Sequence, residues 1–223
     1  SLRHDNYVPD VAIVDPELTL SCPPSVTVSC GMDAFSQLLE SYLSVKANPF
    51  SYALSLNGIE MFQQGFLQSY RNGDDIEARS KMWYASFLSG ITLAQAGLGT
   101  VHGIAGTLGG FFPVPHGVAC GTLLGEVTRE LYLAMKKTDS PYLAKMAKVG
   151  MIFDQSSHQS SDYYCEKLLS VIDGCLSEVR IPGLGEFGVR AEDVAEIAKN
   201  SDNKNSCVQL ETAVIESILS RRL

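Results

Sequence analysis

Two histidines in the middle of the chain, His102 and His116, are placed where they could bind a metal ion. Each is followed by glycine and lies at or near a predicted helix start, and an apolar stretch rich in glycine and proline joins them. Such a stretch can bring two helix starts together, and two neutral imidazoles in a mostly apolar pocket suit a divalent metal. By spacing alone, two histidines fourteen residues apart are more often caps or core residues. The other histidines, His4 in the N-terminal tail and His158 in a Ser/Gln-rich loop, are expected at the surface.

A further carboxylate ligand is available upstream, at the beginning of an apolar helix. Asp33 stands there, and Gln37 and Glu40 follow four and seven residues later, so the three side chains share one helix face. A carboxylate, two imidazoles and an amide oxygen could surround one ion, which makes Asp33, Gln37, His102 and His116 the candidate metal ligands. The alternative is structural, because an aspartate in the first turn of a helix stabilises the helix dipole.

Other chemistries have no matching motif. The glycines at 97 and 99 would need a third glycine at 102 to form the dinucleotide-binding pattern, and the segment before them is predicted to be helix rather than strand. The sequence also lacks the phosphate-binding pattern G-x-x-x-x-G-K-[ST] and the nucleophile pattern G-x-S-x-G. These motifs therefore give no support to a nucleotide loop or a serine hydrolase site in this sequence.

The elements that would position the candidate ligands are helices. From Pro23 onward apolar residues recur at three- and four-residue spacing, and Asn48-Pro49 supplies an N-cap with proline at the first helical position. Asn72-Gly73 ends that helix, and residues 109–115 are expected to be a loop. The patterns predict helices over residues 31–46, 49–70, 74–97, 102–108, 116–136, 141–153, 161–179, 191–199 and 210–221.

One short segment near the N-terminus has a different pattern. Asp10-Val-Ala-Ile-Val-Asp15 is an apolar run between Pro9 and Pro16, which is typical of a buried strand. A lone strand leaves its backbone groups unpaired, and no second strand of equal quality follows. We therefore expect it to pair with a sheet in a preceding part of a longer protein or, as the second choice, with a swapped copy. This divides the chain into residues 1–20, a strand and connector, and residues 21–223, an all-α helical domain.

Composition narrows the class of protein. The chain has 223 residues, 45% hydrophobic and 19% charged, with a net charge of −8. These values exclude a disordered chain, and an acidic chain without a lysine or arginine run has no surface for nucleic acid. No apolar stretch reaches the roughly 18 residues that a membrane span needs. Six scattered cysteines without a C-x-x-C pair are typical of reduced thiols, so a cytoplasmic protein is expected.

Four segments of the sequence, taken together, resemble the motifs of a known protein family. Asp15-Pro-Glu-Leu-Thr, Gly31-Met-Asp-Ala-Phe-Ser-Gln-Leu-Leu-Glu40, Gly97-Leu-Gly-Thr-Val-His-Gly-Ile-Ala-Gly106 and Pro115-His-Gly-Val-Ala119 closely resemble the iron-containing (group III) alcohol dehydrogenases. Relatives in that superfamily include glycerol dehydrogenase, maleylacetate reductase and dehydroquinate synthase. The resemblance covers essentially the whole chain and corresponds to the C-terminal helical domain of this dehydroquinate synthase-like fold. It implies that residues 1–20 belong with an N-terminal nucleotide-binding α/β domain.

The resemblance also implies a ligand set. The family holds its metal with an aspartate and three histidines, and Asp33, His102 and His116 match three of these positions. The remaining histidine, expected four residues after the aspartate, is Gln37, whose amide oxygen is a poorer ligand for Fe²⁺ or Zn²⁺. An aspartate with two histidines still leaves an open position, as in the similar glycerol dehydrogenase branch. Gly106 stands where several members carry another histidine, which removes a candidate proton relay.

The activity implied is that of an NAD(P)-dependent, metal-assisted alcohol dehydrogenase or aldehyde reductase. The metal would be Fe²⁺ or Zn²⁺, and NAD or NADP would bind through the N-terminal domain. His102 and His116 would be the catalytic residues, and a small alcohol or aldehyde the substrate. One alternative is a metal-independent reductase of the same fold, resembling maleylacetate reductase. Another is a non-catalytic helical assembly module. A homo-oligomer is expected in either case, because an uncovered strand at residues 11–14 recruits partners.

Overall fold

The helical prediction is confirmed. The computed structural model describes residues 6, 9–154 and 156–223, and among those residues it contains α-helices and short 3-10 turns but no strand. The elements are, in order, η2 (Pro16–Thr19), α1 (Pro24–Leu43), α2 (Pro49–Arg71), α3 (Ile76–Ala96), α4 (Thr100–Phe111), α5 (His116–Lys137), α6 (Tyr142–Ile152), α7 (Ser161–Val179), η3 (Leu184–Phe187), η4 (Ala191–Asp193), α8 (Val194–Asn200) and α9 (Thr212–Ser220).

Local capping chemistry sets several helix starts. The side chain of Asn48 accepts hydrogen bonds from the backbone N–H groups of Phe50 and Ser51, at 3.0 and 3.1 Å, so α2 begins at the predicted residue. Asp75 caps α3 and Ser160 caps α7 in the same way. Each cap satisfies a backbone donor that has no partner within its helix.

The loop predicted over residues 109–115 is partly wrong. Helix α4 continues through both glycines to Phe111, and only the residues that follow it, before His116, connect α4 to α5. Glycine weakens a helix interior by only about 1 kcal/mol relative to alanine, so a packed helix can extend through it. Two prolines, Pro113 and Pro115, then fall in the connection, where a missing backbone N–H does no harm.

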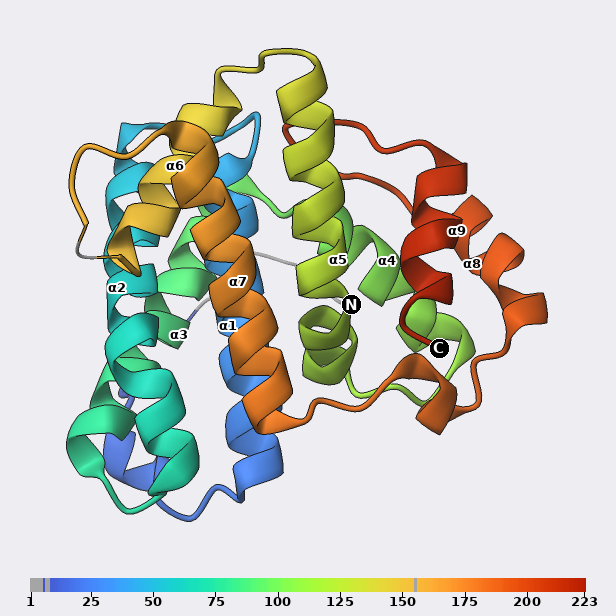
Figure 1. Cartoon of the computed structure of the whole chain (residues 1–223). Coiled ribbons are helices and arrows are strands. Elements are labelled where there is room, and N and C mark those ends of the chain that lie inside the picture. Colours follow the sequence, from blue (N-terminus) through green and yellow to red (C-terminus); the bar gives the residue numbers. More distant parts are fainter. Residues whose placement is uncertain (1–5, 7–8, 155) are drawn as a thin grey trace.

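The helices pack around α5, which lies between two groups (Figure 1). Helices α1, α2 and α3 lie side by side, α6 packs on α7, and α7 also contacts α5. On the other side of α5 lie α4, α8 and α9, with α8 against α9 and α4. Helix α1 contacts both groups, because it packs on α2 and α3 and also touches α5 and α4. The candidate ligands on α1, α4 and α5 are therefore brought to one place.

A stack of aromatic rings fills the space beside α1. The Phe35 and Phe62 rings are stacked with centroids 4.3 Å apart, and Phe66 stacks on Phe62 at 4.6 Å. Phe153, after α6, meets Phe35 edge-on at 6.1 Å. The rings of Phe35, Phe62 and Phe66 are each 1% exposed. Burying a phenylalanine side chain contributes roughly 1.5–3 kcal/mol, so this stack fixes the orientation of α1.

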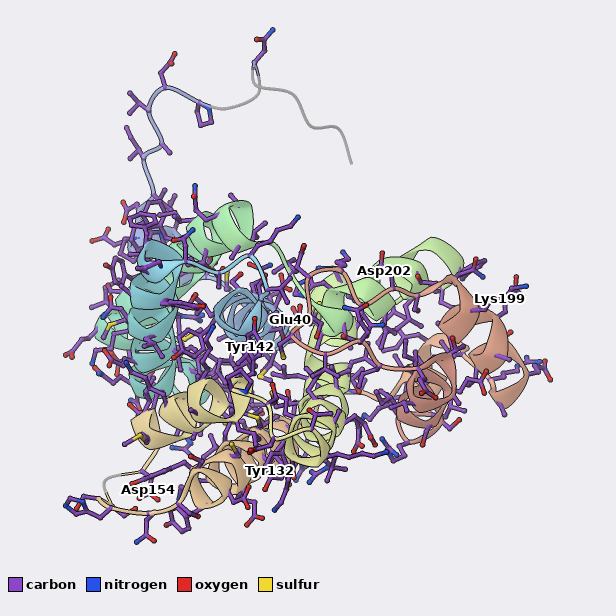
Figure 2. The ribbon with its side chains drawn as sticks, turned by 90° about the horizontal axis from the view of Figure 1, so that it is seen from above. Glu40, Tyr132, Tyr142, Asp154, Lys199 and Asp202 are labelled. Atoms are coloured by element: carbon purple, nitrogen blue, oxygen red, sulfur yellow. The ribbon has the colours of Figure 1, made fainter. Side chains whose placement is uncertain are left out.

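The N-terminal segment departs from its predicted structure. Residues 10–15 form no strand, and they leave the helical body in Figure 2 with Val11 76% and Ile13 91% exposed. Nothing in the described part of the chain pairs with them, as a lone strand requires. Pairing with a sheet outside this chain, and with it the division at residue 20, stays a prediction. The described residues contain no helix long and apolar enough to cross a membrane.

Candidate metal centre

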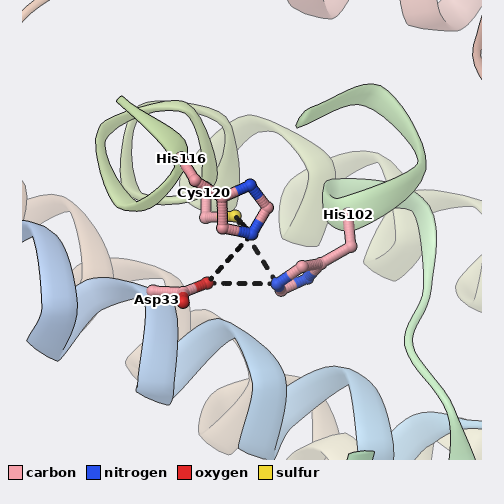
Figure 3. Close-up of side chains that lie close together, drawn as sticks. All are labelled: Asp33, His102, His116 and Cys120. Atoms are coloured by element: carbon pink, nitrogen blue, oxygen red, sulfur yellow. Dashed lines mark hydrogen bonds and ion pairs between the residues drawn. The ribbon is translucent and has the colours of Figure 1, made fainter. Parts of the chain in front are cut away.

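Four side chains from three helices converge at the point where α1, α4 and α5 meet (Figure 3). One ligand atom from each of Asp33, His102, His116 and Cys120 lies within 4.8 Å of every other. The Oδ1 atom of Asp33 lies 3.1 Å from Nε2 of His102 and 3.7 Å from Nε2 of His116. The three residues predicted from helix starts and spacing, Asp33, His102 and His116, are thus neighbours in space.

Two glycines let α5 come close enough to α1 to form this group. A Cβ atom on Gly117 would lie 2.3 Å from the backbone oxygen of Ser29, and one on Gly121 would lie 3.0 Å from Cβ of Met32. No larger residue fits at Gly117, because the obstacle is backbone. The residues just before these glycines, His116 and Cys120, are one turn apart on the same face of α5. Close approach of the helices therefore carries both side chains to Asp33.

Glu40 orients His102 from the buried side. Its Oε2 atom lies 2.7 Å from Nδ1 of His102, and its Oε1 atom accepts a 2.6 Å hydrogen bond from the backbone N–H of Val101. The Glu40 oxygen accepts from the Nδ1–H of His102, which leaves Nε2 facing Asp33, His116 and Cys120. The same carboxylate satisfies a free N–H in the first turn of α4, where Gly99 gives no side-chain cap. The Glu40 side chain is only 5% exposed, and Figure 2 shows the residue in the interior.

Gln37 is placed differently from its prediction as a ligand. Its Nε2 donates a 2.9 Å hydrogen bond to Oδ2 of Asp33, and its Oε1 accepts a 2.8 Å hydrogen bond from Ser89 on α3. The amide oxygen is therefore directed at α3 rather than at the histidines. In this arrangement Gln37 orients Asp33 through the oxygen that His102 does not contact.

Cys120 was missed in the sequence as a member of the site. Its sulfur lies 3.5 Å from Nε2 of His102 and 3.6 Å from Nε2 of His116, and its side chain is completely buried. The signal was present, because a cysteine four residues after a histidine shares its helix face. All six cysteines are free thiols, and Cys120 is the one that the other candidate ligands surround, so residue type alone did not distinguish it from the other five.

The charges of the site are strongly coupled. Burial alone would lower the pKa of His102, but hydrogen bonds to Asp33, Cys120 and Glu40 outweigh it and raise the pKa to about 12. Burial raises the pKa of Asp33, whereas hydrogen bonding and charge attraction to His102 oppose it, and the net pKa falls below its ordinary value. Burial also raises the pKa of the Cys120 thiol to about 12. Without a metal, a positive imidazole is thus held between two carboxylates, and a cation can replace its proton.

The two histidines differ in access. The side chain of His102 is 3% exposed, whereas that of His116 is 54% exposed, so the group opens toward solvent past His116.

His158 is exposed, as predicted, and His4 lies outside the described residues. An apolar pocket of about 300 Å³ lies elsewhere, between the N-terminal segment, α1 and α3, and none of the four clustered residues lines it.

Comparison with known proteins agrees with the resemblance seen in the motifs. Residues 27–220 match the family described as "Fe-containing alcohol dehydrogenase family, C-terminal". Alcohol dehydrogenase 4 of Saccharomyces cerevisiae is 32% identical over 197 residues, which cover 88% of this chain and 49% of the yeast protein. The NAD-dependent methanol dehydrogenase of Bacillus methanolicus is 30% identical over 198 residues, which cover 88% of this chain and 50% of that protein. The chain spans about half the length of the curated relatives it matches.

Solved structures give the same result for the fold. The crystal structure of a 1,3-propanediol oxidoreductase superposes on this chain with a TM-score of 0.88 at 29% sequence identity. The superposition covers 97% of this chain and 56% of the other. The all-α fold expected from the resemblance is therefore confirmed.

Proposed function

Because this chain belongs to the iron-containing alcohol dehydrogenase family and matches its C-terminal part, we propose that it is the metal-binding domain of an NAD(P)-dependent alcohol dehydrogenase. The substrate would be a small alcohol, or the corresponding aldehyde in the reverse direction. The single observation that carries the proposal is the convergence of Asp33, His102 and His116 from three helices on one point. Family membership alone would not establish chemistry, since function resides in the site.

The donor set fits a divalent transition metal. A carboxylate oxygen and two imidazole nitrogens face one another, and the sulfur of Cys120 completes a group of four atoms within 4.8 Å. Oxygen, nitrogen and sulfur donors at this spacing suit Fe²⁺ or Zn²⁺ better than they suit Mg²⁺ or Ca²⁺. When bound, such an ion acts as a Lewis acid on the oxygen of the alcohol or carbonyl group.

The protein residues around the ion have separate tasks. Glu40 accepts a hydrogen bond from the Nδ1–H of His102, which holds the proton on Nδ1 and would leave the Nε2 lone pair available to the ion. Gln37 holds the Asp33 carboxylate from its other oxygen. His116 borders the open side, from which a substrate would enter, and the buried His102 side chain closes the inner side against water. In this proposal His102 and His116 are the catalytic residues through their contact with the metal.

The cofactor and the compartment are part of the proposal. The methanol dehydrogenase of Bacillus methanolicus is named as NAD-dependent, which supports a nicotinamide cofactor for the protein containing this chain. NAD or NADP would bind through an N-terminal domain and receive hydride from the alcohol carbon. A homo-oligomer is proposed on the sequence argument alone. A cytoplasmic location is proposed on the sequence argument and on the six free thiols.

An activity assay on the whole natural protein tests this function. Short alcohols should drive reduction of NAD⁺ or NADP⁺, a chelator should abolish the reaction, and Zn²⁺ or Fe²⁺ should restore it. Activity that survives complete metal removal would instead support the metal-independent reductase, in which the imidazolium of His102 polarises the carbonyl directly. No turnover by a folded, metal-loaded protein with any short alcohol would favour the assembly module.

A further inference from the structure

We propose that Cys120 is the fourth protein ligand of the metal centre, and that its thiolate makes the site selective for Zn²⁺ over Fe²⁺. The inference rests on the proposed metal centre and goes beyond it, because it assigns a ligand and a metal. It also reassigns Gln37, which the sequence suggested as the ligand, to a positioning role.

The amide of Gln37 is already occupied. Its nitrogen donates to Asp33 and its oxygen accepts from Ser89, at 2.9 and 2.8 Å. To ligate a metal, the oxygen would have to leave Ser89 and turn toward the histidines, which breaks both hydrogen bonds. A neutral amide oxygen gains little from such a change, because it is a weaker ligand than imidazole or thiolate for these metals.

Cys120 is already in position. Zinc–sulfur bonds of about 2.3 Å and zinc–nitrogen bonds of about 2.0–2.1 Å, meeting at a tetrahedral angle, separate sulfur from nitrogen by about 3.6 Å. The sulfur of Cys120 lies 3.5 and 3.6 Å from the two Nε2 atoms. In Figure 3 it sits beside both imidazoles and Asp33, so an ion among the four atoms needs only small movements of the side chains.

A buried cysteine is often an ordinary apolar core residue, and this chain contains one for comparison. Cys165 is as buried as Cys120, but its sulfur contacts the backbone oxygen of Leu143. The Cys120 sulfur instead lies within hydrogen-bond distance of two imidazole nitrogens, both of which belong to proposed ligands. The two cysteines have the same degree of burial and differ in what surrounds the sulfur.

The charges and donor types of the four proposed ligands favour zinc. A thiolate and one carboxylate balance the two positive charges of the ion, and the two imidazoles are neutral. Thiolate is a soft donor that favours zinc, and zinc also binds nitrogen and sulfur sites more tightly than Fe²⁺ in the general order of divalent metals. As the metal binds, the thiol proton of Cys120 and the Nε2 proton of the His102 imidazolium both leave to solvent, with no change of oxidation state.

X-ray absorption at the zinc edge tests the assignment on the full chain without any mutation. The expected result is one sulfur neighbour at about 2.3 Å together with nitrogen or oxygen neighbours at about 2.0–2.1 Å. The Co²⁺-loaded protein should also show a sulfur-to-cobalt charge-transfer band in the near ultraviolet. Bound zinc with no sulfur neighbour would overturn the Cys120 assignment and leave the metal centre intact. A folded protein that binds no zinc would contradict the metal centre itself.

Three matched variants make the test specific. Cys120→Ser should remove the charge-transfer band and weaken zinc binding more than about 100-fold, a larger loss than the removal of an outer hydrogen bond. Cys165→Ser removes an equally buried thiol and should leave both measurements unchanged. Gln37→Ala should keep the band and weaken binding by about 10–100-fold, as the loss of an outer hydrogen-bond partner does. The opposite ranking, with Gln37→Ala the more damaging change, would identify Gln37 as the ligand and refute the proposal.

Discussion

Helix α1 has two faces that pack against other helices and differ in the kind of contact they make. One face carries Phe35, which lies in a stack of aromatic rings with α2 and the end of α6. The opposite face carries Asp33, Gln37 and Glu40, which contact α3, α4 and α5 through hydrogen bonds and ion pairs. Glu40 on the polar face is buried like Phe35 on the apolar face, so burial alone does not distinguish structure from function here.

The two faces of α1 differ in how strictly their contacts depend on geometry. Apolar packing is non-directional, and it stabilises the fold in proportion to the area buried. The polar face is directional, because each carboxylate oxygen must meet a particular donor, and burial of an unpaired charge is costly. The apolar face should therefore control stability, and the polar face should control metal binding.

The largest effect is expected on the apolar face. Phe35→Ala removes a ring that is 1% exposed and stacked on Phe62, which should lower the free energy of unfolding by about 3–5 kcal/mol. Denaturant titration measures the loss. The matched control, Phe50→Ala, removes a ring that is 58% exposed on α2 and should change stability by about 0.5 kcal/mol or less. Equal losses in the two variants would contradict the assigned role of the aromatic stack.

On the polar face, removal of the exposed ligand should separate binding from stability. His116→Ala deletes a side chain that is 54% exposed, so the free energy of unfolding without metal should change by about 0.5 kcal/mol or less. Zinc affinity, measured by competition with a chromogenic chelator, should fall more than about 100-fold, because a direct ligand contributes more than an outer contact. His158→Ala is the control, since that exposed histidine is outside the site. Unchanged affinity in His116→Ala would remove His116 from the metal centre.

Removal of the orienting charge should have a smaller effect on binding. Glu40→Gln keeps the size of the side chain but weakens its hold on Nδ1 of His102, which should lower zinc affinity about 10–100-fold. The same competition titration measures it. Glu60→Gln, a substitution of an exposed glutamate on α2, serves as the control. A Glu40→Gln protein that binds zinc as tightly as the parent would show that the carboxylate serves only to cap α4.

The pH dependence of the metal-free protein should be the most gradual effect. The folded pKa of His102 is raised above the unfolded value of about 6.5, so the folded state holds an extra proton above that pH. The stabilisation is complete below about pH 6.5 and decreases as the pH rises toward the folded pKa, by at most about 1.4 kcal/mol per pH unit. Denaturant titrations of chelator-treated protein between pH 6 and 9 should show this decline. It should be absent in His102→Gln, and a decline of equal slope in that variant would exclude His102 as its source.

The parts of the fold that depend on neighbours in sequence could be predicted. Apolar spacing and caps placed α7 at Ser161–Val179 and the start of α2 at Pro49, and the structure has those same residues. The strand predicted over residues 10–15 depends on a partner, and none of the described residues supplies one. The local sequence pattern predicts which secondary structure a segment favours. Whether a strand forms also depends on a partner strand elsewhere in the protein.

The candidate site was also predicted only in part from the sequence. Asp33, His102 and His116 were recognised from residue type, helix starts and the family resemblance. The bond from Glu40 to His102 joins residues 62 positions apart, and that from Cys120 to His102 joins residues 18 apart. Helical periodicity within one segment does not predict contacts between distant segments. The four-residue spacing of His116 and Cys120 did place both side chains on one face of α5.

The most direct test of the central claim is the metal content of the chain. Protein purified without chelator or affinity metal, then supplied with Zn²⁺ and Fe²⁺ together and desalted, would be analysed by mass spectrometry for metal per chain. All proposed ligands belong to this chain, so about one equivalent of zinc should be retained, and His102→Ala should retain none. A folded parent chain without bound metal, or one equivalent still bound by His102→Ala, would contradict the assignment of the polar face of α1 as a metal centre.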